Sequence, residues 1–147
     1  MKKENYFTIA IAIVTVYAIA MAFLESAVVV YLRKIYYPSG FNFPLASFME
    51  PSILNIEWIR EIGTLIILGS VAILAGRKGY EKFGYFLYSF AIWDIFYYIF
   101  LKLILNWPSS FLTWDLLFLV PFPWVGPVAA PIIYSVTIAV LALFIIY

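Results

Sequence analysis

The 147-residue sequence contains no cysteine and no histidine. Without cysteine, the chain can form no disulfide, cysteine-ligated iron–sulfur cluster, catalytic thiol or S-acyl anchor. Without histidine, it lacks the usual axial ligand of haem and the usual nitrogen ligand of zinc or copper. No cofactor is evident, and we expect neither haem nor an iron–sulfur cluster. A divalent cation bound by carboxylate oxygens stays open as an alternative.

Charged residues are also scarce. They make up 12% of the chain, whereas hydrophobic residues make up 66%. Soluble domains are usually about half apolar and about a quarter charged, and a chain of this length still needs polar residues over most of its surface. The composition therefore predicts an integral membrane protein with the lipid bilayer as its main partner. The net charge of +1 gives no indication of a nucleic-acid partner.

The motifs of common soluble enzymes are missing as well. The sequence has no phosphate-binding glycine loop, no nucleophile elbow and no histidine-based dyad. It also has no internal repeat and no low-complexity tract that would mark a linker. We therefore predict a single integral membrane domain over residues 1–147, and we leave open whether the protein is an enzyme.

Four long apolar segments are present instead. A spanning helix needs about 20 apolar residues to cross a hydrocarbon core of about 30 Å. By this standard we predict spans at about residues 6–32, 55–76, 83–105 and 127–147. The basic start and apolar run also resemble a signal peptide, but the run continues to Leu32, so we interpret it as a retained first span. A signal peptide cleaved near the small residues at 18–20 is the alternative. The predicted fold class is an all-α, polytopic transmembrane helical bundle.

Two connections between the spans are unusual. Residues 37–54 are aromatic, proline-bearing and nearly uncharged, which is typical of a loop in the membrane interface. Residues 108–126 include an apolar piece of only about ten residues, which is too short for a spanning helix. We predict a re-entrant or interfacial half-helix at about residues 110–120, ended by Pro121 and Pro123. A very short fifth span is the alternative.

The basic residues near the span ends predict the orientation, because cytoplasmic loops carry an excess of lysine and arginine. With the N-terminus inside, five basic residues face the cytoplasm: Lys2, Lys3, Arg77, Lys78 and Lys82. Three lie at the outer ends: Arg33, Lys34 and Lys102. Four spans return the C-terminus to the cytoplasm. We expect an integral protein of the bacterial cytoplasmic membrane with both termini in the cytoplasm.

Several ionisable residues fall inside or beside the spans, at a similar depth in the outer half. These six are Glu25, Arg60, Glu61, Asp94, Lys102 and Asp115. A charge near the bilayer centre costs at least about 2.5–3.5 kcal/mol, so we predict that they share one interior cluster. We expect Asp94 to pair with Arg60, and Lys102 to pair with Asp115 or Glu25.

The helical spacing supports this cluster. Glu57, Arg60, Glu61 and Thr64 follow one another as i, i+3, i+4 and i+7, which places them on one face of the second span. Asp94, Tyr98 and Lys102 follow one another at steps of four in the third span. Trp93 and Trp114 each precede a carboxylate. We include Trp93, Trp114 and Tyr98 among the ligand-binding candidates, although an interfacial belt is the commoner role of tryptophan.

Three other charged residues, Glu57, Arg33 and Lys34, are interpreted as interfacial anchors whose long side chains reach the membrane surface.

Of the six clustered groups, four are carboxylates and two are cations. A low dielectric disfavours this surplus of negative charge, which protonation of a carboxylate or capture of a cation would remove. The cluster therefore suits a proton or a hard cation such as Mg²⁺ or Ca²⁺.

Three functions remain open on this basis. The first is a polar cavity in the outer half that binds an ion, a proton or a small polar or lipidic ligand, with transport or coupling as its use. The second is a membrane-embedded enzyme that acts on a lipid head group with Glu or Asp as acid and base. The third is a non-catalytic accessory subunit of a membrane complex.

Ala72 and Gly76 form a small-xxx-small pattern that favours tight packing in the bundle or in a homo-oligomer.

Overall fold

The structure is a computed structural model that describes residues 3–43, 45 and 49–147. The described chain forms four helices and one β-hairpin, in the order α1 (Lys3–Tyr36), α2 (Pro51–Ala75), α3 (Gly79–Leu105), β1 (Trp114–Phe118), β2 (Trp124–Pro127) and α4 (Ala129–Ile146). Each helix is long and apolar enough to cross a membrane. The four predicted helices are confirmed, and α1, α2 and α3 extend by several residues beyond the predicted bounds.

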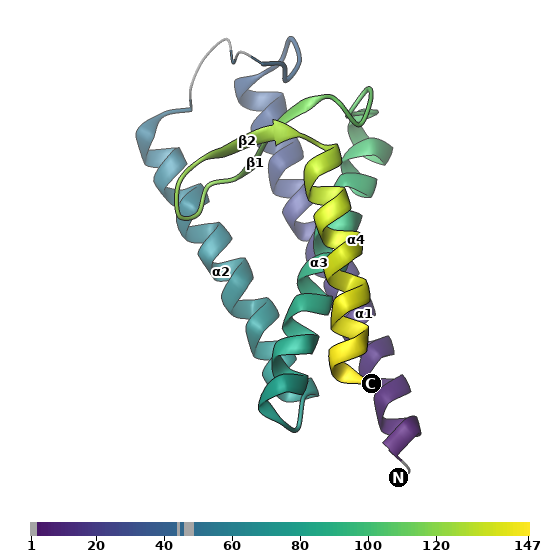
Figure 1. Cartoon of the computed structure of the whole chain (residues 1–147). Helices are drawn as coiled ribbons and strands as arrows, with labels where there is room; N and C mark the ends of the chain where they lie inside the picture. Colours follow the sequence, from purple (N-terminus) through teal and green to yellow (C-terminus); the bar gives the residue numbers. More distant parts are fainter. Residues whose placement is uncertain (1–2, 44, 46–48) are drawn as a thin grey trace.

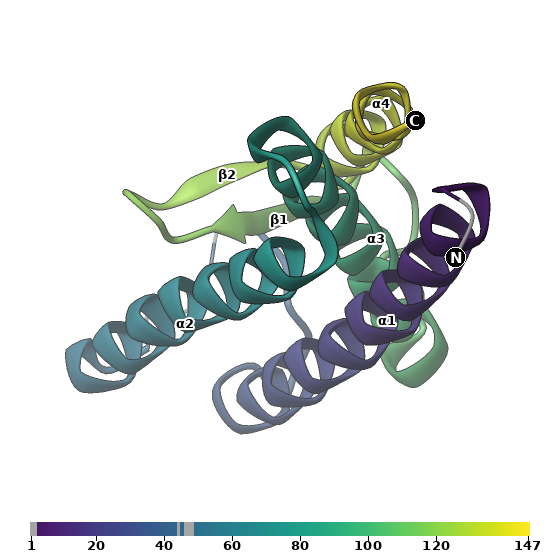
Figure 2. The same cartoon turned by 90° about the horizontal axis from the view of Figure 1, so that it is seen from below.

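The four helices run alternately up and down, so that both termini and the turn between α2 and α3 lie at one end of the molecule (Figure 1). The end of α1, the start of α2 and the β-hairpin lie towards the opposite end, here called the hairpin end (Figure 1). Helix α3 is central and packs against α1, α2 and α4 (Figure 2). Helix α2 diverges from α1 towards the hairpin end (Figure 1). Two termini at one end agree with four crossings, and the side that faces the cytoplasm stays a prediction.

The half of the bundle near the termini is held by close apolar packing. Ala10, Val14, Ala72 and Tyr85 belong to one buried cluster built from α1, α2 and α3, to which α4 also contributes. Small residues allow helix backbones to approach closely in a membrane. Gly84 of α3 lies so near α4 that an added Cβ would be 2.6 Å from a side-chain carbon of Ile146.

The turn between α2 and α3 is short and tight. A Cβ at Gly76 would lie 2.5 Å from the backbone nitrogen of Lys82, so no larger residue fits there. The carboxylate of Glu81 accepts the backbone N–H groups of Arg77 and Lys78, which caps the start of α3. The turn therefore fixes α2 and α3 as antiparallel neighbours.

The connection before α4 is an antiparallel hairpin and contains no half-helix. Strand β1 pairs with β2 in a register that places Asp115 opposite Gly126 and Leu116 opposite Val125. The predicted half-helix at residues 110–120 was wrong, the segment forms no fifth helical span, and the fold is mainly rather than wholly α-helical. Pro121 and Pro123 lie in the turn between the strands, where proline removes no ladder hydrogen bond. Pairing two short segments satisfies backbone groups that an isolated apolar piece would leave exposed in lipid.

The predicted interfacial loop over residues 37–54 lies in part outside the described residues. Its last four residues belong to α2, which begins with Pro51. Proline suits the first turn of a helix, because its missing N–H has no intrahelical partner there.

Candidate functional site

A cavity of about 80 Å³ lies in the hairpin half of the molecule, between α1, α2, α3 and β1. We call it the charged chamber. Seven charged residues line it: Glu25, Arg33, Glu57, Arg60, Glu61, Asp94 and Asp115. Five carboxylates therefore face two guanidinium groups, a formal surplus of three negative charges.

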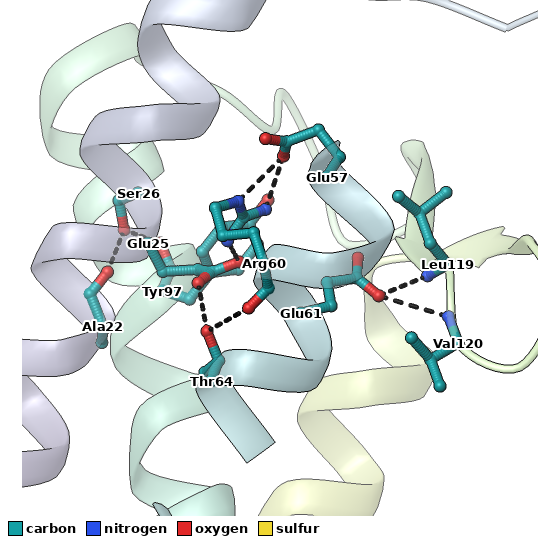
Figure 3. A network of polar contacts seen from close by, with 10 residues as sticks. All are labelled: Ala22, Glu25, Ser26, Glu57, Arg60, Glu61, Thr64, Tyr97, Leu119 and Val120. Carbon is teal, nitrogen blue, oxygen red and sulfur yellow. Dashed lines mark hydrogen bonds and ion pairs between the residues drawn. The ribbon is translucent and has the colours of Figure 1, made fainter. Parts of the chain in front are cut away.

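Arg60 of α2 connects two carboxylates on one side of the chamber (Figure 3). Its Nε and Nη2 donate to Oε2 of Glu57 over 3.0 and 2.6 Å, and its Nη1 forms an ion pair with Glu25 of α1. The hydroxyl of Thr64 donates to the other oxygen of Glu25 over 3.1 Å. This network joins α1 to α2 where the two helices diverge.

Two sequence-based expectations about this network were wrong. Arg60 pairs with Glu25 and Glu57, not with Asp94, because its side chain extends from α2 towards α1 (Figure 3). Glu57 is not an interfacial anchor, since it is only 6% exposed and binds Arg60 inside the protein.

Glu61 follows Arg60 in sequence but extends in another direction, towards the hairpin (Figure 3). Its Oε2 accepts the backbone N–H groups of Leu119 and Val120 over 2.8 and 3.2 Å. Within the described chain, Glu61 has no arginine or lysine at ion-pair distance. The carboxylate therefore fastens the end of β1 to α2 through neutral donors alone.

Asp115 of β1 is held by α1 and α3. It is 1% exposed, and its two oxygens accept from Nη2 of Arg33 over 2.9 Å and from the hydroxyl of Tyr98 over 3.1 Å. The Arg33 guanidinium also lies 4.2 Å from the ring centroid of Phe41 and 3.8 Å from that of Trp107. Burial raises the pKa of Asp115 to about 6, although Arg33, Tyr98 and the N–H of Leu116 oppose the shift.

Arg33 was missed as a site residue and interpreted as an interfacial anchor, which was wrong because it is 7% exposed and paired with Asp115. The signal that would have found it is its spacing from Glu25. The two residues are eight apart on α1, and positions i and i+8 share a helix face. Lys34, by contrast, is exposed.

Asp94 of α3 accepts a hydrogen bond from the hydroxyl of Ser135 in α4 over 2.7 Å. In the described part of the chain it too has no ion-pair partner. Asp94 lines the charged chamber and also a neighbouring pocket of about 280 Å³ between α3, the hairpin and α4. It is therefore part of the wall that the chamber and this larger pocket share.

Two buried hydrogen-bond donors at the chamber are unused. Nε1 of Trp93 and Nη1 of Arg33 have no hydrogen-bond partner among the described residues, and both side chains line the chamber. The Trp93 ring itself packs against Phe90, Tyr97 and Phe118. The chamber therefore combines a surplus of acceptors with unsatisfied donors.

Lys102 and Trp114 lie apart from the chamber. The ammonium of Lys102 donates to the carbonyls of Asn106 and Pro108 over 3.4 and 3.0 Å, so the expected pairing with Asp115 or Glu25 was wrong. Lys102 lies in the last turn of α3, where it interacts with the loop that follows the helix. Trp114 is 54% exposed. The ligand-binding role assigned to these two residues stays a prediction.

Among the described residues, no three or more of His, Cys, Asp and Glu are arranged to hold a metal ion. The expectation of a divalent cation is therefore neither supported nor tested by the geometry. Comparisons of the chain with models of protein families, with curated proteins and with solved structures found no match. The function has to be inferred from the chemistry of the site.

Proposed function

We propose that the charged chamber is a hydrated proton-binding site in a membrane protein, and that proton uptake there is coupled to transport or to another process across the membrane. The observation that carries the proposal is the surplus of carboxylates over guanidinium groups around the charged chamber. A low dielectric disfavours uncompensated charge, and a buried carboxylate without a cation takes up a proton. Ionisable residues within membrane spans commonly mark such paths.

The ion pairs indicate which carboxylates take the proton. Arg33 compensates Asp115, and Arg60 is shared by Glu25 and Glu57. Glu61 and Asp94 accept only from backbone N–H groups and from a serine hydroxyl. Since neither has a cation at ion-pair distance, these two are the proposed proton acceptors.

The size and the donors of the chamber favour water as the medium. A water molecule takes up about 30 Å³ of liquid volume, so a cavity of about 80 Å³ suits two or three of them. Water can accept from Trp93 and Arg33 and can donate to the carboxylates. Leaving a buried donor unsatisfied costs about 1–3 kcal/mol, which a bound water avoids.

Asp94 provides the route into the chamber. It lies between the chamber and the pocket formed by α3, α4 and the hairpin, and Ser135 orients its carboxyl group. In the proposed orientation, with both termini in the cytoplasm of a bacterial cell, this route opens in the outer half of the membrane. The small volume and the negative charge of the chamber argue against a phosphate-bearing lipid head group as its ligand.

Infrared spectroscopy of the protein in lipid at neutral pH tests the proposal. We expect a band from a protonated carboxyl group, reduced by Glu61→Gln or by Asp94→Asn. Glu50→Gln is the matched control, because Glu50 is exposed and lies outside the chamber. Absence of the band, or a band that neither chamber variant changes, would refute the proposal. Suppression of the band by Mg²⁺ or Ca²⁺ would replace the proton with a cation as the resident ligand.

A further inference from the structure

A second pocket, of about 520 Å³, lies between α3, α4 and residues 108–111. Its α3 wall consists of Ile95, Tyr98, Ile99 and Lys102, which share one helix face. The volume falls within the range of ligand pockets, about 300–1,000 Å³. This pocket does not open on any of the chamber's carboxylates, and its chemistry is therefore different from that of the chamber.

The polarity of the pocket changes along its length. Lys102 and the hydroxyls of Ser109 and Ser110 lie at the hairpin end, where α3 ends. Ile95 begins the α3 wall about 10 Å deeper along the helix, since seven residues at 1.5 Å separate it from Lys102. Ile132 of α4 faces the same space. The pocket is thus basic and hydroxylated at a helix end and apolar towards the middle of the bundle.

Lys102 has binding capacity that the protein does not use. An ammonium group has three donors, and Lys102 gives two of them to the carbonyls of Asn106 and Pro108. Within the described chain no carboxylate lies at ion-pair distance from it, and the side chain is exposed. The hydroxyl of Ser110 accepts the N–H of Leu112, which leaves its own hydrogen available to donate.

We propose that this pocket binds an anionic phospholipid, with the phosphate at Lys102 and one acyl chain along Ile99 and Ile132. A lysine at the end of a membrane helix lies at head-group level. A basic, hydroxyl-bearing end followed by an apolar wall matches such a lipid, in which the phosphate and glycerol precede the acyl chain. The ligand is a membrane lipid rather than free phosphate, because most of the lining is apolar.

Native mass spectrometry of the whole chain, titrated with phosphatidylglycerol or phosphatidylcholine, tests the proposal. The wild-type protein should bind phosphatidylglycerol more tightly. Lys102→Gln should weaken phosphatidylglycerol binding about fivefold, because a basic residue near a membrane surface contributes about 1 kcal/mol to the attraction for anionic lipid. Lys34→Gln is the matched control, since Lys34 is also exposed and lies in the last turn of its helix, α1. Lys34→Gln should leave the preference intact.

A second pair of variants tests the apolar part without changing charge. Ile99→Trp should fill the pocket and weaken binding of the lipid several-fold, whereas Ile104→Trp, on an equally exposed part of α3 outside the pocket, should not. Equal losses for Lys102→Gln and Lys34→Gln would show diffuse electrostatic attraction and would overturn the proposal. Unchanged binding in Ile99→Trp would overturn the placement of the acyl chain. Glycerol phosphate without acyl chains should not compete, and effective competition would identify a phosphate site instead.

Discussion

The two halves of this bundle are held together in different ways, although the same helices run through both. Near the termini, alanines and a glycine allow α1, α3 and α4 to pack closely, and the interior is apolar. Towards the hairpin end α2 diverges from α1 (Figure 1). There Arg60 pairs with Glu25 of α1, and Glu61 binds the hairpin. Close packing gives stability directly, whereas a buried ion pair must first offset its desolvation. The hairpin half therefore provides room for a polar site.

The largest expected effect is the loss of the network around Arg60. Arg60→Leu leaves Glu25 and Glu57 buried without their cation, and removal of one partner of a buried pair typically costs about 3–5 kcal/mol. Unfolding in mixed micelles should show this loss. The further change Glu25→Leu should restore part of it.

A matched double variant sharpens this test. Arg60 and Asp94 form no ion pair, so Asp94→Leu should restore less of the stability lost in Arg60→Leu than Glu25→Leu restores. Greater recovery with Asp94→Leu than with Glu25→Leu would contradict the observed pairing and would favour the pairing expected from the sequence.

The next effect is the pH dependence of Asp115. Its pKa is about 6 in the folded protein, against an ordinary value of 3.8 for a free aspartate side chain, so the folded state binds more protons between these pH values. The stability from this group is complete below about pH 3.8 and is lost as the pH rises through about 6, by roughly 3 kcal/mol at most. Denaturation at pH 5 and pH 7.5 should show that the protein is less stable at the higher pH. Asp115→Asn should remove the part of this pH dependence that comes from Asp115. An identical slope in both proteins would contradict the assignment.

In the half near the termini, Gly84→Ala should destabilise the protein by about 1–3 kcal/mol, because the new Cβ meets Ile146 and overpacks the contact between α3 and α4. Gly63→Ala is the control, since a Cβ there meets nothing within 4 Å. Thermal unfolding should separate the two variants. Equal stability would mean that α4 shifts without cost.

The smallest effect is that of Tyr98→Phe. This change removes one hydrogen bond to Asp115 and should cost about 1 kcal/mol. The Tyr98 hydroxyl also lowers the pKa of Asp115, so the variant should raise that pKa further. A titration of Asp115 that moves towards lower pH in the variant would contradict the role of Tyr98 as a donor.

The helices could be predicted from the sequence, because a membrane span is defined by length and apolar composition, which are local properties. The gathering of Glu25, Arg60, Glu61 and Asp115 could also be expected, because isolated charges in lipid are costly. The pairing of these residues with one another could not be predicted from the sequence. Successive residues on a helix point about 100° apart, so Arg60 and Glu61 reach α1 and the hairpin respectively, and only the tertiary arrangement decides which groups meet.

The hairpin was missed for a related reason. The apolar piece over residues 110–120 is too short for its period to distinguish helix from strand. Its partner strand, Trp124–Pro127, pairs across a turn that contains Pro121 and Pro123. We interpreted these prolines as the end of a helix, whereas they mark the turn of a hairpin.

The two oxygens of Glu61 have separate tasks. Oε2 alone accepts both N–H groups of the hairpin, so that it serves as a mechanical fastening, while Oε1 takes no part in those bonds (Figure 3). A proton can therefore join or leave Oε1 without releasing the hairpin from α2. In Glu61→Gln the side-chain carbonyl can still accept both N–H groups of the hairpin, while an NH₂ group replaces the oxygen that would exchange the proton. The variant therefore loses proton exchange and keeps the hydrogen bonds that hold the hairpin to α2. Alanine would remove both at once.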